Sequence, residues 1–494
     1  MNNDEIKVTG HIVTSNALWR LAERFCAQGV NFVISVVLAR ILMPEEYGLC
    51  ALTMTFTTIL SVFINSGLGT ALIQRKEIDD LDCSTALWAN ICIGIFLYVL
   101  LYLAAPFLAW FFKQERMVPV LRVLGLTIVI GSVNAIQQAR ISRRMQFKMF
   151  FKATIIGTII SAFVGIGMAM RGMGVWALVG QHLTNQVIDT IILWISIKWK
   201  PSFIFSMSRL KPLYSFGWRA YGAQMIDTLY NNLRSILIGR YYSAEQLAFF
   251  NKGRHIPSLI NLNTTNAVQS VLFPAYAKYS DNRPQMLKMI RRAISLSTYF
   301  IFPCMMGLAT VSESLVVVLY TSKWLPCVPF LRICCFFYAI QPLQLINLQA
   351  ILAIGRSDLS LKLEIIKKSV TVTVLVICIH ISMFATAVCA IPLGVFALIV
   401  NTYPAKREFN YPLISQLVDV IPQFLMSLAM GVCVILVGRV SDRYIVKLVL
   451  QVITGTAVYI GLSIATQNKD FRFVLGYLRG IFDRVRRNRS GNAA

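Results

Sequence analysis

The chain of 494 residues is 56% hydrophobic and only 14% charged. Soluble proteins carry about 25% charged residues, so a soluble globular fold is excluded. Apolar runs of about twenty residues or more can cross a hydrocarbon core of about 30 Å, and they indicate an all-α polytopic membrane protein rather than a β-barrel of short strands. The formal net charge of +25 fits Lys and Arg in short loops on one side of a membrane and in the tail, and does not require nucleic acid as a partner.

The N-terminal segment, residues 1–15, is polar. It lacks the apolar region and the small-residue cleavage site of a secretory signal peptide, so we expect the first span itself to direct insertion.

Hydropathy predicts about fourteen transmembrane helices in chain order. The eleventh and twelfth are the hardest to separate, because residues 370–400 are almost continuously apolar. Lys and Arg are concentrated in the loops after the even-numbered spans, which predicts that these loops and both termini are cytoplasmic. The predicted spans are 17–41, 48–69, 84–112, 119–138, 152–171, 174–197, 213–240, 246–272, 292–320, 328–351, 364–384, 386–403, 416–438 and 445–466.

The second half of the sequence repeats the first. Trp19-Arg20 returns as Trp218-Arg219, and the run from Val118 to Arg122 returns as Val328 to Arg332. Two similar helical lobes have a natural working site in the cleft between them, which is typical of transporters. We therefore predict an N-terminal six-helix lobe in residues 1–205, a C-terminal six-helix lobe in 206–408, two additional helices in 409–466, and a basic amphipathic cytoplasmic tail in 467–494.

The tail carries several arginines with apolar residues between them, beginning at Phe471, Arg472 and Phe473. This pattern is typical of a segment lying on anionic lipid, and a frayed basic tail fits it as well.

No catalytic motif is present. The four histidines are far apart in the sequence, and the chain has no P-loop, GxSxG, HExxH or paired-carboxylate catalytic motif. The eleven cysteines lie mostly in apolar segments, where a free thiol behaves as a small hydrophobe. We therefore predict that the protein is not an enzyme and has no catalytic residue, no cofactor and no metal site.

The informative signal is charge inside the predicted spans, where ionisable groups are costly and usually face a cavity or a partner. Such cations suit phosphate or pyrophosphate, and neighbouring amides suit sugar hydroxyls. In the first span the candidates are Arg20, Glu23, Arg24 and Asn31; in the seventh they are Arg219, Asp227, Asn231 and Arg234; in the eighth they are Lys252 and Arg254.

Other roles fit some of these residues equally well. Arg20 and Arg219 lie near cytoplasmic helix ends, from which long side chains reach the interface. Glu23 with Arg24, and Asp227 with Arg234, could be structural pairs, and either acid could instead couple transport to an ion.

Two further patterns fit the membrane interface. Arg122 and Arg332 are equivalent in the repeat and lie near the outer ends of the fourth and tenth spans, which indicates a shared structural or interfacial role. The tryptophans fit aromatic interface belts; they include Trp88, Trp110, Trp194, Trp199 and Trp324.

Three segments carry a resemblance to a known family. They are LARILMPEEYGLCAL (Leu38–Leu52), GLGTALIQRKEI (Gly67–Ile78) and VLFPAYAKYSDN (Val271–Asn282). With them the chain resembles the polysaccharide transporter family of the MOP flippase superfamily, and within it the Wzx-type exporters of the colanic-acid kind.

The resemblance implies two six-helix bundles arranged as a V with two extra C-terminal helices, in the bacterial inner membrane. It implies flipping of undecaprenyl-pyrophosphate-linked oligosaccharide units by alternating access, for exopolysaccharide, capsule or O-antigen synthesis. The expected partners are this lipid-linked oligosaccharide, membrane lipids and a polysaccharide polymerase. The residues that match the family's cationic cavity are Arg20, Arg24, Arg219, Arg234, Lys252 and Arg254.

Three other functions stay open. A drug or cation antiporter of the same superfamily needs acidic residues in its cavity, and only Glu23 and Asp227 qualify. A membrane polymerase of lipid-linked sugars would be expected to have a long outer loop, which the predicted spans leave no room for. A scaffold gives intramembrane charge no purpose and is the weakest of the three.

Overall fold

The computed structural model describes residues 10–65, 67–75, 78–144, 146–197, 199–279 and 282–476. Within these ranges, every regular element is helical, which confirms the all-α fold class. Side chains are not described for residues 10–25, 216, 217, 219, 220, 267, 270, 271, 273, 274 and 277.

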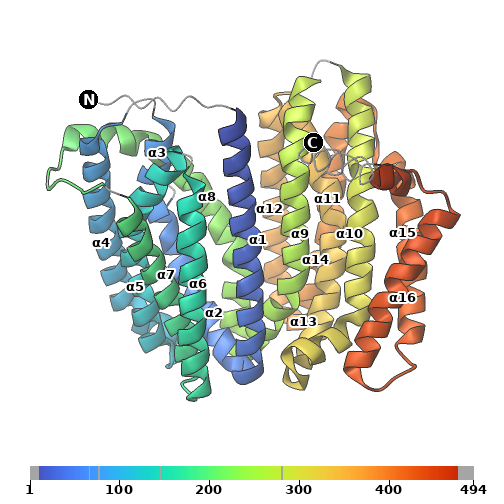
Figure 1. The fold of residues 1–494 in the computed structure, drawn as a ribbon, viewed down its shortest axis with the longest axis horizontal. Helices are drawn as coiled ribbons and strands as arrows, with labels where there is room; N and C mark the ends of the chain where they lie inside the picture. Colours follow the sequence, from blue (N-terminus) through green and yellow to red (C-terminus); the bar gives the residue numbers. More distant parts are fainter. Residues whose placement is uncertain are drawn as a thin grey trace, which may run out of the picture. The chain divides into compact units, whose positions relative to one another are not determined.

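The chain forms two compact units, the first being Met1–Ala248. In it α1 packs on α6, α4 on α5, and α6 on α7 (Figure 1). Its helices are α1 (Gly10–Ile41), α2 (Pro44–Asn65), α3 (Leu68–Gln74), α4 (Asp80–Phe112), α5 (Met117–Arg143), α6 (Phe147–Met170), α7 (Val175–Ser196) and α8 (Met207–Tyr241).

The second unit is Phe249–Ala494. The apolar run 370–400 is divided at Ser382, whose side chain accepts a hydrogen bond from the backbone N–H of Ala385 and begins a new helix. The helices that follow α8 are α9 (Ala244–Lys278), α10 (Arg283–Tyr320), the 3-10 helix η1 (Ser322–Cys327), α11 (Val328–Ala353), α12 (Ser357–Ile381), α13 (Met383–Val388), α14 (Ala390–Phe409), α15 (Leu413–Val437) and α16 (Tyr444–Ala465).

A helix occupies every predicted span, and nine stretches of the described residues are long and apolar enough to cross a membrane. The chain is therefore a multi-pass membrane protein. The long helices outside this set are α1, α7, α8, α9 and α12, and their polar residues lower their hydropathy. The nine stretches are Pro44–Gln74, Asp80–Phe112, Met117–Arg143, Phe147–Met170, Arg283–Tyr320, Ser322–Ala353, Met383–Phe409, Leu413–Val437 and Tyr444–Ala465.

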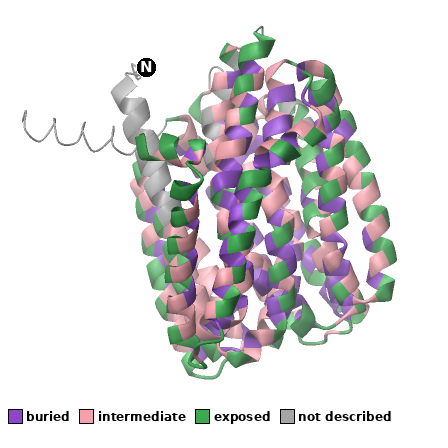
Figure 2. Ribbon diagram, turned by 90° about the vertical axis from the view of Figure 1, so that its right-hand side faces the viewer, coloured by how far each residue is buried: buried purple, intermediate pink, exposed green. Residues whose placement is uncertain are grey.

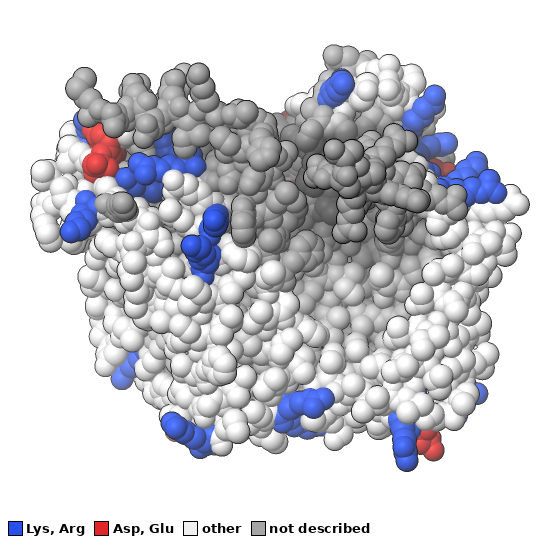
Figure 3. Space-filling model, in the orientation of Figure 1, with Lys and Arg blue, Asp and Glu red and all other residues white. Residues whose placement is uncertain are grey.

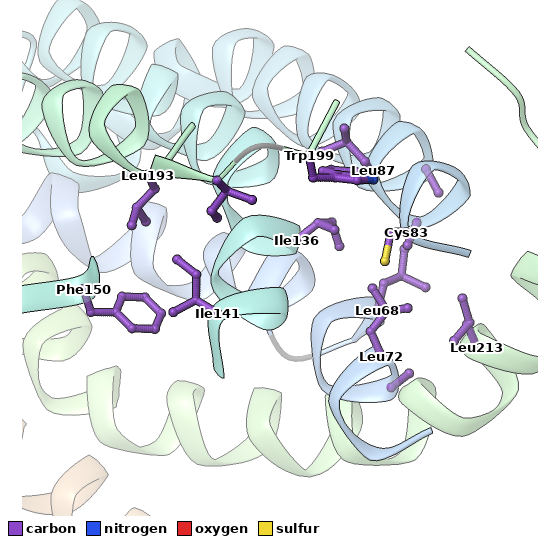
Figure 4. Packing of buried hydrophobic residues seen from close by; sticks show 14 of the residues in the cluster. Leu68, Leu72, Cys83, Leu87, Ile136, Ile141, Phe150, Leu193, Trp199 and Leu213 are labelled. Carbon is purple, nitrogen blue, oxygen red and sulfur yellow. The ribbon is translucent and has the colours of Figure 1, made fainter. Parts of the chain in front are cut away.

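One hydrophobic core of the first unit takes residues from α3, α4, α5, α6, α7 and α8. Figure 4 shows Leu68 and Leu72 of α3 beside Cys83 and Leu87 of α4, with side chains from the later helices closing the cluster. Burial follows the helical repeat, since inward positions are buried and outward positions are exposed (Figure 2). The remaining labelled members are Ile136, Ile141, Phe150, Leu193, Trp199 and Leu213.

The segment between α7 and α8 is fixed to the start of α4. The indole N–H of Trp88 donates to the carbonyl of Ser202 at 2.9 Å, and the Trp88 ring stacks on Phe203. The hydroxyl of Ser84 accepts from the backbone N–H of Ser202 at 3.1 Å. These contacts, together with packing of α8 on α2, α3 and α4, keep α8 in the first unit. The predicted lobe boundary after residue 205 is based on the sequence repeat and not on packing, and it stays a prediction.

The second unit is organised around α10, which packs against α11, α15 and α16. The phenol of Tyr299 donates to the hydroxyl of Ser463 at 3.0 Å, and the phenol of Tyr459 donates to the carbonyl of Tyr299 at 2.8 Å. Apolar side chains from α10, α15 and α16 form a common cluster there. The last two long helices are thus an integral part of this unit.

Charged side chains are concentrated near the ends of the helices. In the view of Figure 3 the described surface along the middle of the helices is mostly uncharged, and the Lys and Arg side chains lie toward the two ends. Such a band is what a hydrocarbon core requires, because a charge there is costly.

Candidate substrate-binding site

A polar stripe runs along α8. Asp227, Asn231 and Arg234 follow one another at four and three residues, so they share one face of the helix. The side chains of Asp227 and Asn231 are exposed and that of Arg234 is partly exposed, whereas Thr228 and Ile238 are buried. Ile238 lies one turn beyond Arg234 on this same face, so the face is exposed at Asp227 and Asn231 and becomes buried toward the end of the helix.

A second stripe lies on α1. Gln28, Asn31 and Ser35 are spaced at three and four residues, and Asn31 is exposed. The carbonyl of Ser35 accepts a hydrogen bond from the phenol of Tyr47 at 3.4 Å. Extended by one turn toward the N-terminus, this face reaches Arg24.

Four of the predicted residues lie outside the described side chains. They are Arg20, Glu23 and Arg24 of α1 and Arg219 of α8.

Lys252 of α9 is buried in the second unit, at 6% exposure. Its ammonium lies 4.4 Å from the centre of the Tyr320 ring and 5.4 Å from that of the Trp324 ring. Aromatic faces attract a cation, most strongly where water is excluded. The assignment of Trp324 and Trp199 to interface belts is wrong, because Trp324 is fully buried and Trp199 is buried in the core of the first unit, whereas Trp110 is largely exposed.

Arg254, two residues further along α9, has a different aromatic partner. Its Nε donates to the phenol oxygen of Tyr338 on α11 at 2.9 Å. Gly253 between the two cations lies against η1 and α11, where an added Cβ would come within 2.7 Å of the Cys327 carbonyl. This close approach brings α9 near enough for both cations to reach aromatic residues of the same unit.

Each unit therefore presents its own set of predicted residues. The first unit carries Asn31, Asp227, Asn231 and Arg234 on α1 and α8, and the second carries Lys252 and Arg254 inside an aromatic environment. The aromatic partners of Lys252 and Arg254, which are Tyr320, Trp324 and Tyr338, could not be predicted from the sequence. They are distant in the chain, and an aromatic residue in an apolar helix does not by itself indicate a contact with a cation.

The chemistry of these groups suits an anion rich in hydroxyl groups. Guanidinium groups bind phosphate oxygens through paired N–H donors, and side-chain amides both donate to and accept from hydroxyl groups. Within the described residues there is no cluster of three or more His, Cys, Asp or Glu side chains that could hold a metal ion.

Comparison with known proteins places the chain in a family. The chain is 28% identical to the teichuronic acid biosynthesis protein TuaB of Bacillus subtilis over 355 residues, which cover 70% of this chain and 72% of TuaB. It is 25% identical to the succinoglycan biosynthesis transport protein ExoT of Rhizobium meliloti over 317 residues, or 64% of each chain.

The fold matches that of the lipid II flippase MurJ in its inward closed conformation. The TM-score is 0.74 at 14% identity, and the match covers 92% of this chain and 99% of MurJ. A family model described as polysaccharide biosynthesis protein matches residues 37–329. Because this match spans more than half of its length, the chain belongs to the polysaccharide biosynthesis protein family.

Proposed function

We propose that the protein is a flippase that moves undecaprenyl-pyrophosphate-linked oligosaccharide units across the bacterial inner membrane for exopolysaccharide, capsule or O-antigen synthesis. The observation that carries the proposal is the polar face of α8, where Asp227, Asn231 and Arg234 recur on a helix of a polysaccharide biosynthesis protein. TuaB and ExoT, by their names, belong to polysaccharide pathways, which supports this substrate class.

In this proposal the protein has two lobes, residues 1–205 and 206–408, and both termini are cytoplasmic. The head group binds to cationic side chains, and alternating access of the two lobes carries it across the membrane. Arg24 and Arg234 hold the pyrophosphate, while Arg20 and Arg219 lie toward the entrance. Asn31 and Asn231 bind sugar hydroxyl groups. The basic tail, residues 467–494, is cytoplasmic in this proposal, and Asp470 near its start is bonded to Arg292 and Gln423 of the second unit.

Lys252 and Arg254 have a secondary part in this proposal. Lys252 is almost fully buried and the Nε of Arg254 is engaged with Tyr338. The direct contacts with the head group are therefore assigned to the arginines of α1 and α8.

Ion coupling is assigned to the acids of the same faces, Glu23 and Asp227. Either carboxylate could bind a proton or sodium ion and so alter the net charge that the head group meets. An antiporter would need such acids to dominate its binding region, whereas cations outnumber acids among the candidate residues of α1, α8 and α9.

The experiment uses purified protein in proteoliposomes that contain a polyprenyl-pyrophosphate-linked oligosaccharide in both leaflets. A membrane-impermeant sugar-modifying reagent is added outside. We expect the protected inner-leaflet pool to become accessible much faster with protein than without it. Unchanged protection, together with export of a cationic dye by the same vesicles, would instead identify an antiporter, and extension of the oligosaccharide would identify a polymerase.

A further inference from the structure

A pocket of about 360 Å³ opens on the first unit between α4 and α5. This volume lies within the range of ligand pockets, about 300–1,000 Å³. Most of its lining is aromatic or aliphatic, and one side chain is charged. The lining includes Tyr98 and Tyr102 of α4 and Val118, Pro119, Arg122 and Leu126 of α5.

The guanidinium of the charged residue, Arg122, lies over an aromatic ring, with its central carbon 4.1 Å from the centre of the Tyr102 ring. Its Nε is buried and has no hydrogen-bond partner among the described residues. A buried N–H without an acceptor costs about 1–3 kcal/mol, so an added acceptor would be favoured here.

The sequence repeat allows Arg122 to be compared with its equivalent in the second unit. Arg332 is the equivalent of Arg122, and its Nε donates to the hydroxyl of Ser312 at 2.9 Å. The same shift in residue number that relates Arg122 to Arg332 relates Tyr102 to Ser312. The second unit thus supplies an internal acceptor at the place where the first unit has a ring and a pocket.

The position of the pocket indicates which molecule reaches it. Helix α5 has 27 residues, which is about 40 Å, or about 10 Å more than the hydrocarbon core. Arg122 is about 7.5 Å from the first residue of α5, and so lies close to the interface. Apolar residues of α4 near the pocket are exposed, with Leu103 at 71% and Trp110 at 74%, as expected of a helix surface that contacts acyl chains.

We propose that this pocket is a binding site for an anionic phospholipid. The lipid phosphate pairs with the guanidinium of Arg122, and the first part of an acyl chain lies against Tyr98, Val123 and Leu126. Arginine suits this role because its planar fork binds phosphate oxygens while its other face stays on the Tyr102 ring. The site is separate from the polar faces of α1 and α8 and does not depend on the proposed function.

The test is native mass spectrometry of the full-length protein in detergent, titrated with phosphatidylglycerol. We expect Arg122→Gln to weaken binding of the first lipid by about tenfold, because a charge-assisted hydrogen bond is lost. Arg332→Gln is the matched control and should bind as the wild type does. Phosphatidylethanolamine, which is zwitterionic, should bind wild type more weakly than phosphatidylglycerol.

A second variant keeps the charge in place. Tyr102→Ser gives Arg122 a hydroxyl acceptor like the one that Arg332 has. Binding of phosphatidylglycerol should therefore also fall, although no cation is removed. This variant tests the proposal if Arg122→Gln does not elute as a folded monodisperse protein. Equal binding of phosphatidylglycerol by wild type and both variants would overturn the proposal. Displacement of the lipid by inorganic phosphate would overturn it too, since the pocket would then be a site for a free anion.

Discussion

The amino group of Lys252 lies inside the second unit, beneath the rings of Tyr320 and Trp324. Two effects oppose one another there. Removing the ammonium loses a desolvated cation–π contact worth about 2 kcal/mol, and it also removes the several kcal/mol of desolvation that a buried charge costs.

We therefore expect Lys252→Met, which is unbranched and only one heavy atom shorter, to leave the thermal midpoint of the purified protein within a few degrees of wild type. Trp324→Ala is the matched comparison. Its free energy of unfolding should fall by about 3–5 kcal/mol, because the substitution leaves a cavity at a fully buried site. In an export assay Lys252→Met should change the rate by less than about threefold. Abolished export at unchanged stability would show that Lys252 touches the substrate directly.

The same residue shows where sequence reasoning stops. Hydropathy marked Lys252 as a charge in a span, and that much follows from the residue itself. The ring of Trp324 over it depends on the approach of α9 to η1 at Gly253, and a tryptophan near a predicted helix end is equally typical of an interface belt. Burial of a single side chain is a tertiary property that the local pattern does not contain.

At the scale of elements, the segment after α16 is attached to the second unit through one carboxylate. Asp470 is 2% exposed, and it accepts hydrogen bonds from Arg292 of α10 and Gln423 of α15, each at 2.9 Å. The hydroxyl of Ser295 donates to it as well. Arg292 also stacks on Phe473, which follows in the same segment.

We expect Asp470→Asn to destabilise the protein by about 2 kcal/mol, because the amide places a donor among donors and removes a charge-assisted hydrogen bond. Thermal unfolding in detergent measures the loss, and trypsin should cleave after Lys469 or Arg472 sooner than in wild type. Asp442→Asn, in the exposed turn before α16, is the control and should change neither. Cleavage and unfolding equal to wild type in Asp470→Asn would show that the attachment lies elsewhere.

The start of α4 provides a pH-dependent contact outside the span. The Asp79 carboxylate caps the helix by accepting the backbone N–H of Asp82 at 2.7 Å, and it also pairs with Arg209 at 3.1 Å. The cap first and the arginine second lower the pKa of Asp79 below its ordinary value. A lowered pKa means that the contact stabilises fully above about pH 4, the value of an unfolded Asp, and is lost as the pH falls through the folded pKa.

Asp79→Asn keeps a good helix cap but does not titrate. We therefore expect the thermal midpoint of wild type to fall more steeply than that of Asp79→Asn between about pH 5 and pH 3, with the two curves parallel at higher pH. The measurement is the unfolding midpoint of both proteins across this range in one detergent. Parallel curves throughout would mean that the capping charge adds no stability.

At the scale of the whole molecule, the helices could be predicted because long apolar runs admit no other backbone structure in lipid. Their order repeats between the halves, and the motifs Leu38–Leu52 and Val271–Asn282 indicated the family that the comparison then confirmed. The grouping into compact units could not be predicted. Sequence repeats begin a new copy before α8, whereas contacts of Trp88 and Ser84 with residues 202 and 203 hold the segment before α8 on the first unit.

The repeat also predicted more symmetry than the structure has. Arg122 and Arg332 correspond in sequence, and a shared role was expected of them. One of them bonds to Ser312, while the other faces a pocket, because its neighbour is Tyr102. A repeat preserves the backbone position of a residue, whereas its chemistry is decided by the side chains that the two copies no longer share.

The most direct test of the flippase account follows lipid-linked oligosaccharide by leaflet, in cells that lack this chain and receive a variant in its place. The variants are wild type, Arg24→Ala with Arg234→Ala, and a control with Arg171→Ala and Arg439→Ala, both exposed in short loops, all present at equal levels. An impermeant sugar-modifying reagent reports the outer leaflet. The account predicts complete pyrophosphate-linked units on the cytoplasmic face in the Arg24/Arg234 variant, and on the outer face with wild type and the control. Outward delivery by the Arg24/Arg234 variant at the wild-type rate would contradict it.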